Sequence, residues 1–85
     1  MATKSVTTRA SFHHLPLEEN YLFEVREGID ASSALSHADV LSAVVQELLL
    51  EATDEENALT GNMAYFCEFA METAKALRTA AGAVA

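Results

Sequence analysis

Two long segments of this chain carry apolar residues at the spacing of an α-helix. Along residues 31–53, and again along residues 55–81, apolar side chains recur at steps of three and four, which places them on one side of a helix. The polar residues 53–57 either separate the two helices or begin the second one, which we expect to start between Asp54 and Ala58. A linker this short predicts an antiparallel helical hairpin.

The apolar surface of this hairpin is wider than one partner helix covers. The second helix has two adjoining apolar stripes, one through Phe66 and one through Phe69, and the first has a broad stripe around Val45. Packing the helices together leaves a second stripe exposed, which favours self-association. We therefore predict an all-α fold, in which two-helix hairpins dimerise into a four-helix bundle. The residues expected in the core or the dimer contact are Phe23, Leu41, Val44, Val45, Leu48, Met63, Tyr65, Phe66, Phe69 and Leu77.

A short stretch before the first helix has the alternation of a β-strand. Tyr21, Phe23 and Val25 lie on one side of residues 21–26, and Gly28 ends the pattern. No second strand is evident in the chain. Residues 21–26 therefore either pair with the same strand of a second subunit or form an extended strap over the helices, since their backbone groups need partners.

The first 20 residues lack a lasting period and are rich in Ser and Thr. We expect a flexible arm over residues 1–20 and a helical hairpin domain over residues 21–85. His13 and His14 are adjacent in this arm. A metal site needs further ligands in fixed geometry, so we interpret both histidines as exposed arm residues.

The chain has 85 residues, one cysteine and a formal net charge of −8. A domain of this size usually needs disulfides, a metal or oligomerisation for stability, and a single Cys67 excludes an intrachain disulfide. The excess of acid disfavours binding to nucleic acid or to anionic membranes. We expect the chain to bind itself and, through an acidic surface, an unknown protein with a basic surface. The candidate acidic residues are Glu47, Glu51, Asp54, Glu55 and Glu56.

No grouping of catalytic residues is evident in the sequence. Cys67 has apolar neighbours along its helix, and Ser36 and His37 have no oriented base or oxyanion hole beside them. We expect no enzyme activity, no cofactor and no metal. The chain lacks the apolar core of a signal peptide and an apolar run of about 18 residues, so we expect a cytoplasmic protein.

Three motifs mark the predicted strand and helices. Residues 22–29 read Leu-Phe-Glu-Val-Arg-Glu-Gly-Ile, residues 34–38 read Ala-Leu-Ser-His-Ala, and residues 74–77 read Ala-Lys-Ala-Leu. With Leu41, these motifs resemble a family of small bacterial proteins catalogued only as a domain of unknown function. Many members have proline at the position of Glu27, and their linkers differ. The resemblance covers residues 21–77, implies a strand followed by two helices, and carries no known chemistry.

These observations predict a non-enzymatic, homodimeric helical module for protein interaction. The alternative is an acidic inhibitor or nucleic-acid mimic that binds a basic regulator or nuclease, which rests on the 13 acidic residues. Mimicry requires carboxylates in rows on one rigid surface, whereas scattered carboxylates favour ordinary solubility.

Overall fold

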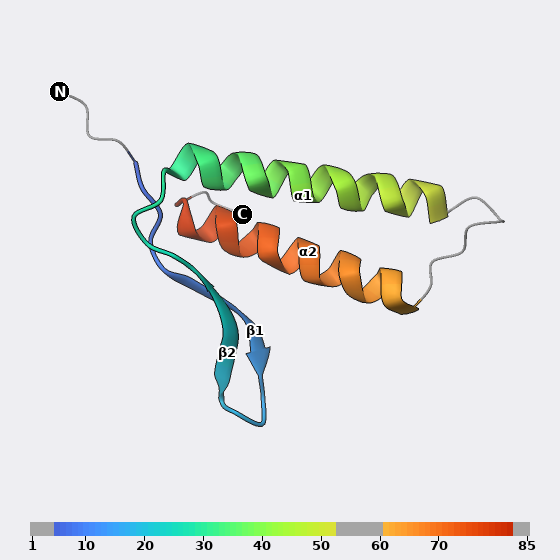
Figure 1. Cartoon of the computed structure of the whole chain (residues 1–85), viewed down its shortest axis with the longest axis horizontal. Helices are drawn as coiled ribbons and strands as arrows, with labels where there is room; N and C mark the ends of the chain where they lie inside the picture. The colour runs from blue at the N-terminus through green and yellow to red at the C-terminus, as the bar shows by residue number, and fades with distance from the viewer. Residues whose placement is uncertain (1–4, 53–60, 83–85) are drawn as a thin grey trace.

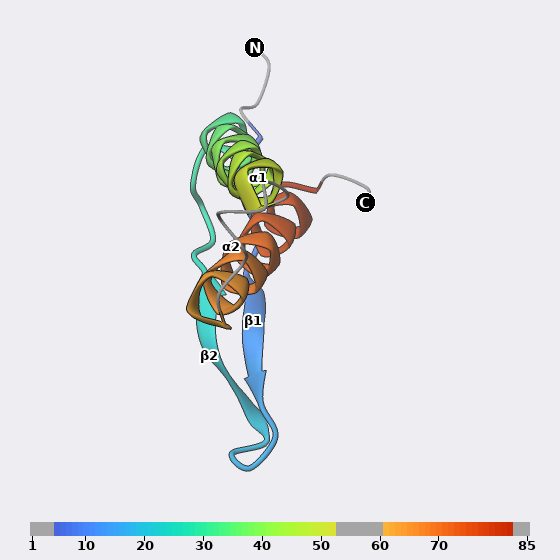
Figure 2. The ribbon, with the colours of Figure 1, turned by 90° about the vertical axis from the view of Figure 1, so that its right-hand side faces the viewer.

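The computed structural model describes residues 5–52 and 61–82, which form a β-hairpin and two helices (Figure 1). In chain order the elements are β1 (Ala10–Leu15), β2 (Asn20–Val25), α1 (Ala31–Ala52) and α2 (Gly61–Ala80). The two helices are antiparallel, and the hairpin contacts α2 but not α1, so α2 is the middle element (Figures 1 and 2). This α+β fold shows that the predicted all-α fold is wrong.

Small side chains form the contact between the helices. Ala38 of α1 and Ala74 of α2 are completely buried, and Val45 of α1 packs with Cys67 and Ala70 of α2. Leu41 and Leu48 are partly buried against that cluster. No large side chain among the described residues is fully buried. Alanine allows helix axes to approach closely, but it supplies little apolar area for stabilising the fold.

Local signals fix the helix ends where the structure describes them. Asp30 precedes the first residue of α1, and its Oδ1 accepts a hydrogen bond of 3.0 Å from the N–H of Ser32. This is the geometry of an N-cap. After α2, Gly82 adopts a φ of 81°, the left-handed conformation that glycine provides at helix C-termini. The predicted start of the second helix, in residues 54–58, lies outside the described residues.

A polar contact joins the outer sides of the two helices. Nη2 of Arg78 in α2 lies 3.3 Å from Oδ1 of Asp39 in α1 and donates a hydrogen bond of 2.9 Å to Oγ of Ser42. The carboxylate of Asp39 is mostly exposed, so this ion pair adds little stability. It does place the end of α2 beside the first half of α1.

The β-hairpin results from a proline-containing turn between two strands. The N–H of Glu18 donates to the carbonyl oxygen of Leu15 at 3.1 Å, with Pro16 in the second position of the turn. Proline favours that position because its φ is fixed. Phe12 lies opposite Phe23 in the antiparallel register. Opposite residues point to the same face of a sheet, so both phenylalanines lie on one face.

The hairpin corrects three predictions. Residues 20–25 form a strand that pairs with β1 of the same chain, so the expectation that the chain holds no second strand is wrong. Residues 10–15, assigned to a flexible arm, form β1. The α2 stripe through Phe69 and Ala76, expected to face other helices in a four-helix bundle, contacts this hairpin instead. The predicted four-helix bundle needs this stripe to pack on helices. Because the hairpin covers the stripe, that bundle is no longer supported.

The alanine contact makes a specific prediction about stability. Ala74→Leu adds three carbons at a completely buried position, and we expect it to lower the free energy of unfolding by about 2 kcal/mol because the helices must move apart. Ala43→Leu makes the same change at an exposed position of α1 and should alter stability by less than about 0.5 kcal/mol. Urea unfolding followed by circular dichroism measures both, and equal effects would contradict the alanine contact.

Candidate protein-interaction surface

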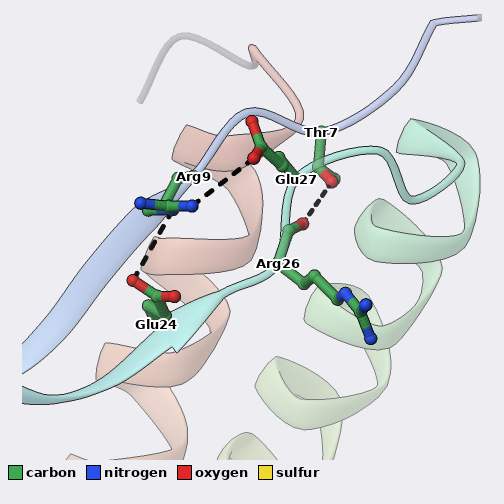
Figure 3. Close-up of polar contacts among 5 residues, drawn as sticks. All are labelled: Thr7, Arg9, Glu24, Arg26 and Glu27. Atoms are coloured by element: carbon green, nitrogen blue, oxygen red, sulfur yellow. Dashed lines mark hydrogen bonds and ion pairs between the residues drawn. The ribbon is translucent and has the colours of Figure 1, made fainter.

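The base of the hairpin is joined to the connection between β2 and α1 through the buried Thr7. Its hydroxyl donates a hydrogen bond of 2.6 Å to the carbonyl oxygen of Arg26 (Figure 3) and accepts one of 3.0 Å from the N–H of Ile29. The N–H of Gly28 donates to the carbonyl oxygen of Thr7 at 2.9 Å. Gly28 has a φ of 83°, which a residue with a Cβ adopts only with strain. These bonds fix the direction in which the chain leaves β2.

Arg9 lies between two carboxylates at the same end of the hairpin. Its Nε is 3.7 Å from Oε2 of Glu24, and its Nη2 is 3.4 Å from Oε1 of Glu27 (Figure 3). All three side chains are largely exposed, so these ion pairs contribute little stability. The side chain of Arg26 points away from this group (Figure 3) and makes no ion pair within residues 5–52 and 61–82.

An aromatic cluster holds the middle of the hairpin against α2. The ring centroid of Phe69 lies 5.5 Å from that of Phe23 and 6.4 Å from that of Phe12. Phe12 and Phe23 also stack on each other, with centroids 5.6 Å apart. Aromatic pairs at these separations contribute about 1 kcal/mol each beyond the area that they bury. The cluster is incomplete as a core, because Phe23 is still 42% exposed.

His13 adds a polar contact to this cluster. It has a φ of 61°, and its N–H donates a hydrogen bond of 2.7 Å to Oε1 of Glu72. Its Nδ1 lies 3.7 Å from Oε2 of the same carboxylate. The His13 ring contacts the edges of Phe23 and Phe69, with centroids 6.0 and 5.8 Å apart. Glu72 thus binds the outer side of β1, the strand that the sequence pattern did not predict.

An open pocket of about 180 Å³ lies at the base of the hairpin, where β2, α1 and α2 meet. Val25, Ile29, Ala34 and Leu77 give it an apolar lining. Its complete lining consists of Thr7, Val25, Ile29, Ser33, Ala34, His37 and Leu77. Because small apolar pockets bind apolar groups, this pocket suits an aliphatic side chain better than a charged ligand.

Large apolar side chains beside this pocket remain exposed. On α1, Val44 follows His37 by two helical turns, so it lies on the side of the helix that lines the pocket. On α2, Phe66 precedes Ala70 by one turn and lies toward the α1 contact. With Phe23 of β2 and Ile29 after it, these residues are between 42% and 50% exposed. We call Phe23, Ile29, Val44 and Phe66 the open face.

The structure divides the predicted core and dimer residues into three groups. Val45 is buried between the helices. Leu41, Leu48, Met63, Phe69 and Leu77 are partly buried. The exposed members are Phe23, Val44, Tyr65 and Phe66. For these four exposed residues, a role in association stays a prediction.

The predicted acidic surface is described only in part. Glu47 and Glu51 are exposed on α1, while Asp54, Glu55 and Glu56 lie outside the described residues. Several other carboxylates already have partners. They are Glu24 and Glu27 with Arg9, Asp39 with Arg78, and Glu72 with His13. The described carboxylates are thus spread over the hairpin and both helices.

The titratable residues considered for chemistry do not converge. His14 faces Tyr21, with ring centroids 5.0 Å apart, whereas the adjacent His13 faces Phe69. Cys67 is buried between the helices. Within residues 5–52 and 61–82, no group of three His, Cys, Asp or Glu side chains has the arrangement of a metal site.

Sequence reasoning missed several residues of this surface. Thr7 is one of three threonines in the first 20 residues, and Glu72 is one of a few charges on the second helix. Neither residue has a local motif that reveals a partner 19 or 59 positions away. Pro16 was a usable signal, because proline between two apolar segments is typical of a turn.

Comparisons of the chain with protein-family models, with curated proteins and with solved structures give no match. The resemblance over residues 21–77 to a domain of unknown function therefore stays a prediction. Neither described helix combines the length and the apolar character that a membrane span requires.

The contact between Glu72 and His13 can be tested by removing the carboxylate of Glu72. We expect Glu72→Ala to lower the free energy of unfolding by about 1 kcal/mol, because it removes the acceptor of the His13 N–H. Glu68→Ala removes an exposed carboxylate one turn away and serves as the matched control. Urea unfolding measures both variants. A loss of the same size in both would show that the His13 contact adds no stability.

Proposed function

We propose that the protein is a non-enzymatic, homodimeric module for protein interaction. The observation that carries this proposal is the open face, whose side chains of Phe23, Ile29, Val44 and Phe66 are between 42% and 50% exposed. Adjoining exposed apolar residues are typical of interaction sites, and aromatic residues are enriched in protein interfaces.

The composition of the core supports self-association. The completely buried residues Ala38 and Ala74 are small, so the larger apolar residues of the chain stabilise the monomer only in part. A chain of 85 residues buries about 60–65% of its unfolded surface. Association that covers the open face adds stabilisation of the kind small domains need.

The acidic residues fit a second, separate role for the surface of α1. Glu47 and Glu51 lie one turn apart and are exposed, so they are available to a protein with a basic surface. The described carboxylates as a whole are spread over three elements, and several are paired. This distribution favours an interaction module over an acidic mimic of nucleic acid.

Sedimentation equilibrium at micromolar concentration tests the proposed dimer. We expect a species of twice the 9.1 kDa chain mass, and we expect Phe66→Ser to raise the dissociation constant by at least about tenfold, because it removes apolar area from both copies. Ala43→Ser, at an exposed position of α1, should leave the constant within about twofold. A folded monomer at all concentrations would contradict the proposal.

A further inference from the structure

The tip of the β-hairpin carries an apolar side chain that this chain does not cover. Leu17, in the turn between β1 and β2, is 98% exposed. The turn lies at the end of the hairpin farthest from the helices (Figure 1). Glu18 and Glu19 follow Leu17 directly and are also exposed. The tip thus combines one leucine with two negative charges.

The base of the hairpin has the complementary properties. The pocket lined by Val25, Ile29 and Leu77 is open and apolar. Arg26, next to Val25, is exposed and is the only basic residue between Glu18 and Glu72. Its side chain points away from Arg9 and the carboxylates that Arg9 binds (Figure 3). A surface that presents a leucine beside carboxylates therefore suits this base, because the pocket is apolar and Arg26 is opposite in charge to the carboxylates.

We propose that the hairpin tip of one copy docks at the hairpin base of a second copy, with Leu17 in the apolar pocket and Glu18 and Glu19 facing Arg26. The inference rests on the proposed homodimer and specifies its contact surface. By two-fold symmetry the contact occurs twice.

The two strands β2 provide the alignment that brings tip and base together. Strands paired about a two-fold axis perpendicular to the sheet are antiparallel, so the tip of each hairpin lies beside the base of the other. The outer side of β1 is already bound by α2 at His13, whose N–H donates to Glu72. Two residues before β1, the N–H of Thr8 donates to the carbonyl oxygen of Ala80. Among the described residues, no hydrogen bond joins β2 to either helix. The outer edge of β2 is therefore the edge available for pairing.

A register centred on Phe23 satisfies the side-chain pattern. Phe23 then lies opposite its own copy, Tyr21 opposite Val25, and Leu22 opposite Glu24. Opposite residues point to the same face, so the first two pairs are apolar on the face that packs against α2. A register centred on Glu24 would place two carboxylates directly opposite each other, which is destabilising. The Phe23 register also sets Asn20 opposite Arg26, next to Glu18 and Glu19.

The size of the pocket agrees with a leucine side chain. The pocket has a volume of about 180 Å³, and apolar cavities of about 150 Å³ bind benzene, which has more carbon atoms than a leucine side chain.

Leu17→Ser tests the contact without disturbing the fold, because the side chain is 98% exposed in the monomer. We expect the dimer dissociation constant to rise roughly a hundredfold, since two leucines per dimer lose their pockets. Leu50→Ser removes another exposed apolar side chain, on a side of α1 away from His37 and Val44, and should leave the constant within about twofold. Sedimentation velocity over a concentration series measures both.

Cysteine cross-linking tests which surfaces meet. In a Cys67→Ala background, chains with Leu17→Cys are mixed with chains with Ile29→Cys and oxidised, and we expect a disulfide-linked pair of unlike chains. Leu17→Cys mixed with Leu50→Cys, on a side of α1 away from the pocket, should give only background linkage. A dimer that keeps its affinity in Leu17→Ser and forms no specific cross-link would overturn the docking of the tip while leaving the proposed homodimer standing. A monomeric parent chain would overturn both.

Discussion

The close contact of α1 and α2 on alanine determines where every larger side chain of this protein can go. With Ala38 and Ala74 completely buried, the space between the helices takes only small or partly buried neighbours. Among the described helical residues, larger side chains such as Phe66, Phe69 and Val44 therefore lie at the margins of the helix pair. Some of them meet the hairpin, as Phe69 and Leu77 do, and others, such as Phe66 and Val44, form the open face.

The β-hairpin completes part of the core and creates a new surface. At its base, the bonds of Thr7 fix it to the connection that leads into α1, and in its middle the rings of Phe12 and Phe23 pack on Phe69. Its tip extends beyond the helices (Figure 2). An isolated pair of strands is marginally stable in water, so the unsupported half of the hairpin is suited to a contact outside its own chain.

The sequence predicts the parts of this structure that depend on local pattern. The spacing of apolar residues and the cap at Asp30 predict α1, and the alternation of Tyr21, Phe23 and Val25 predicts β2. The strand β1 has no comparable pattern, because the adjacent His13 and His14 break the alternation that Ala10 and Phe12 begin. His13 also adopts a positive φ, which is uncommon in a strand.

The partner of each apolar stripe could not be read from the same pattern. Periodicity shows that a stripe will be buried, but not by which element. Both apolar stripes of α2 were expected to pack on helices, whereas the Phe69 stripe is covered by Phe12 and Phe23, 57 and 46 positions earlier in the chain. The pocket at the hairpin base likewise combines residues from Thr7 to Leu77, which no local motif connects.

The most direct test is amide hydrogen exchange measured at low and high protein concentration. It shows whether a second copy covers the surfaces that stay exposed when the helices pack on alanine. Exchange should slow with concentration at the amides of residues 21–25, because each β2 gains a paired edge in the dimer, while the buried middle of α1 should show no such change beyond the overall gain in stability. Exchange in β2 that is independent of concentration, in a range where the dimer forms, would contradict this structure of the interface.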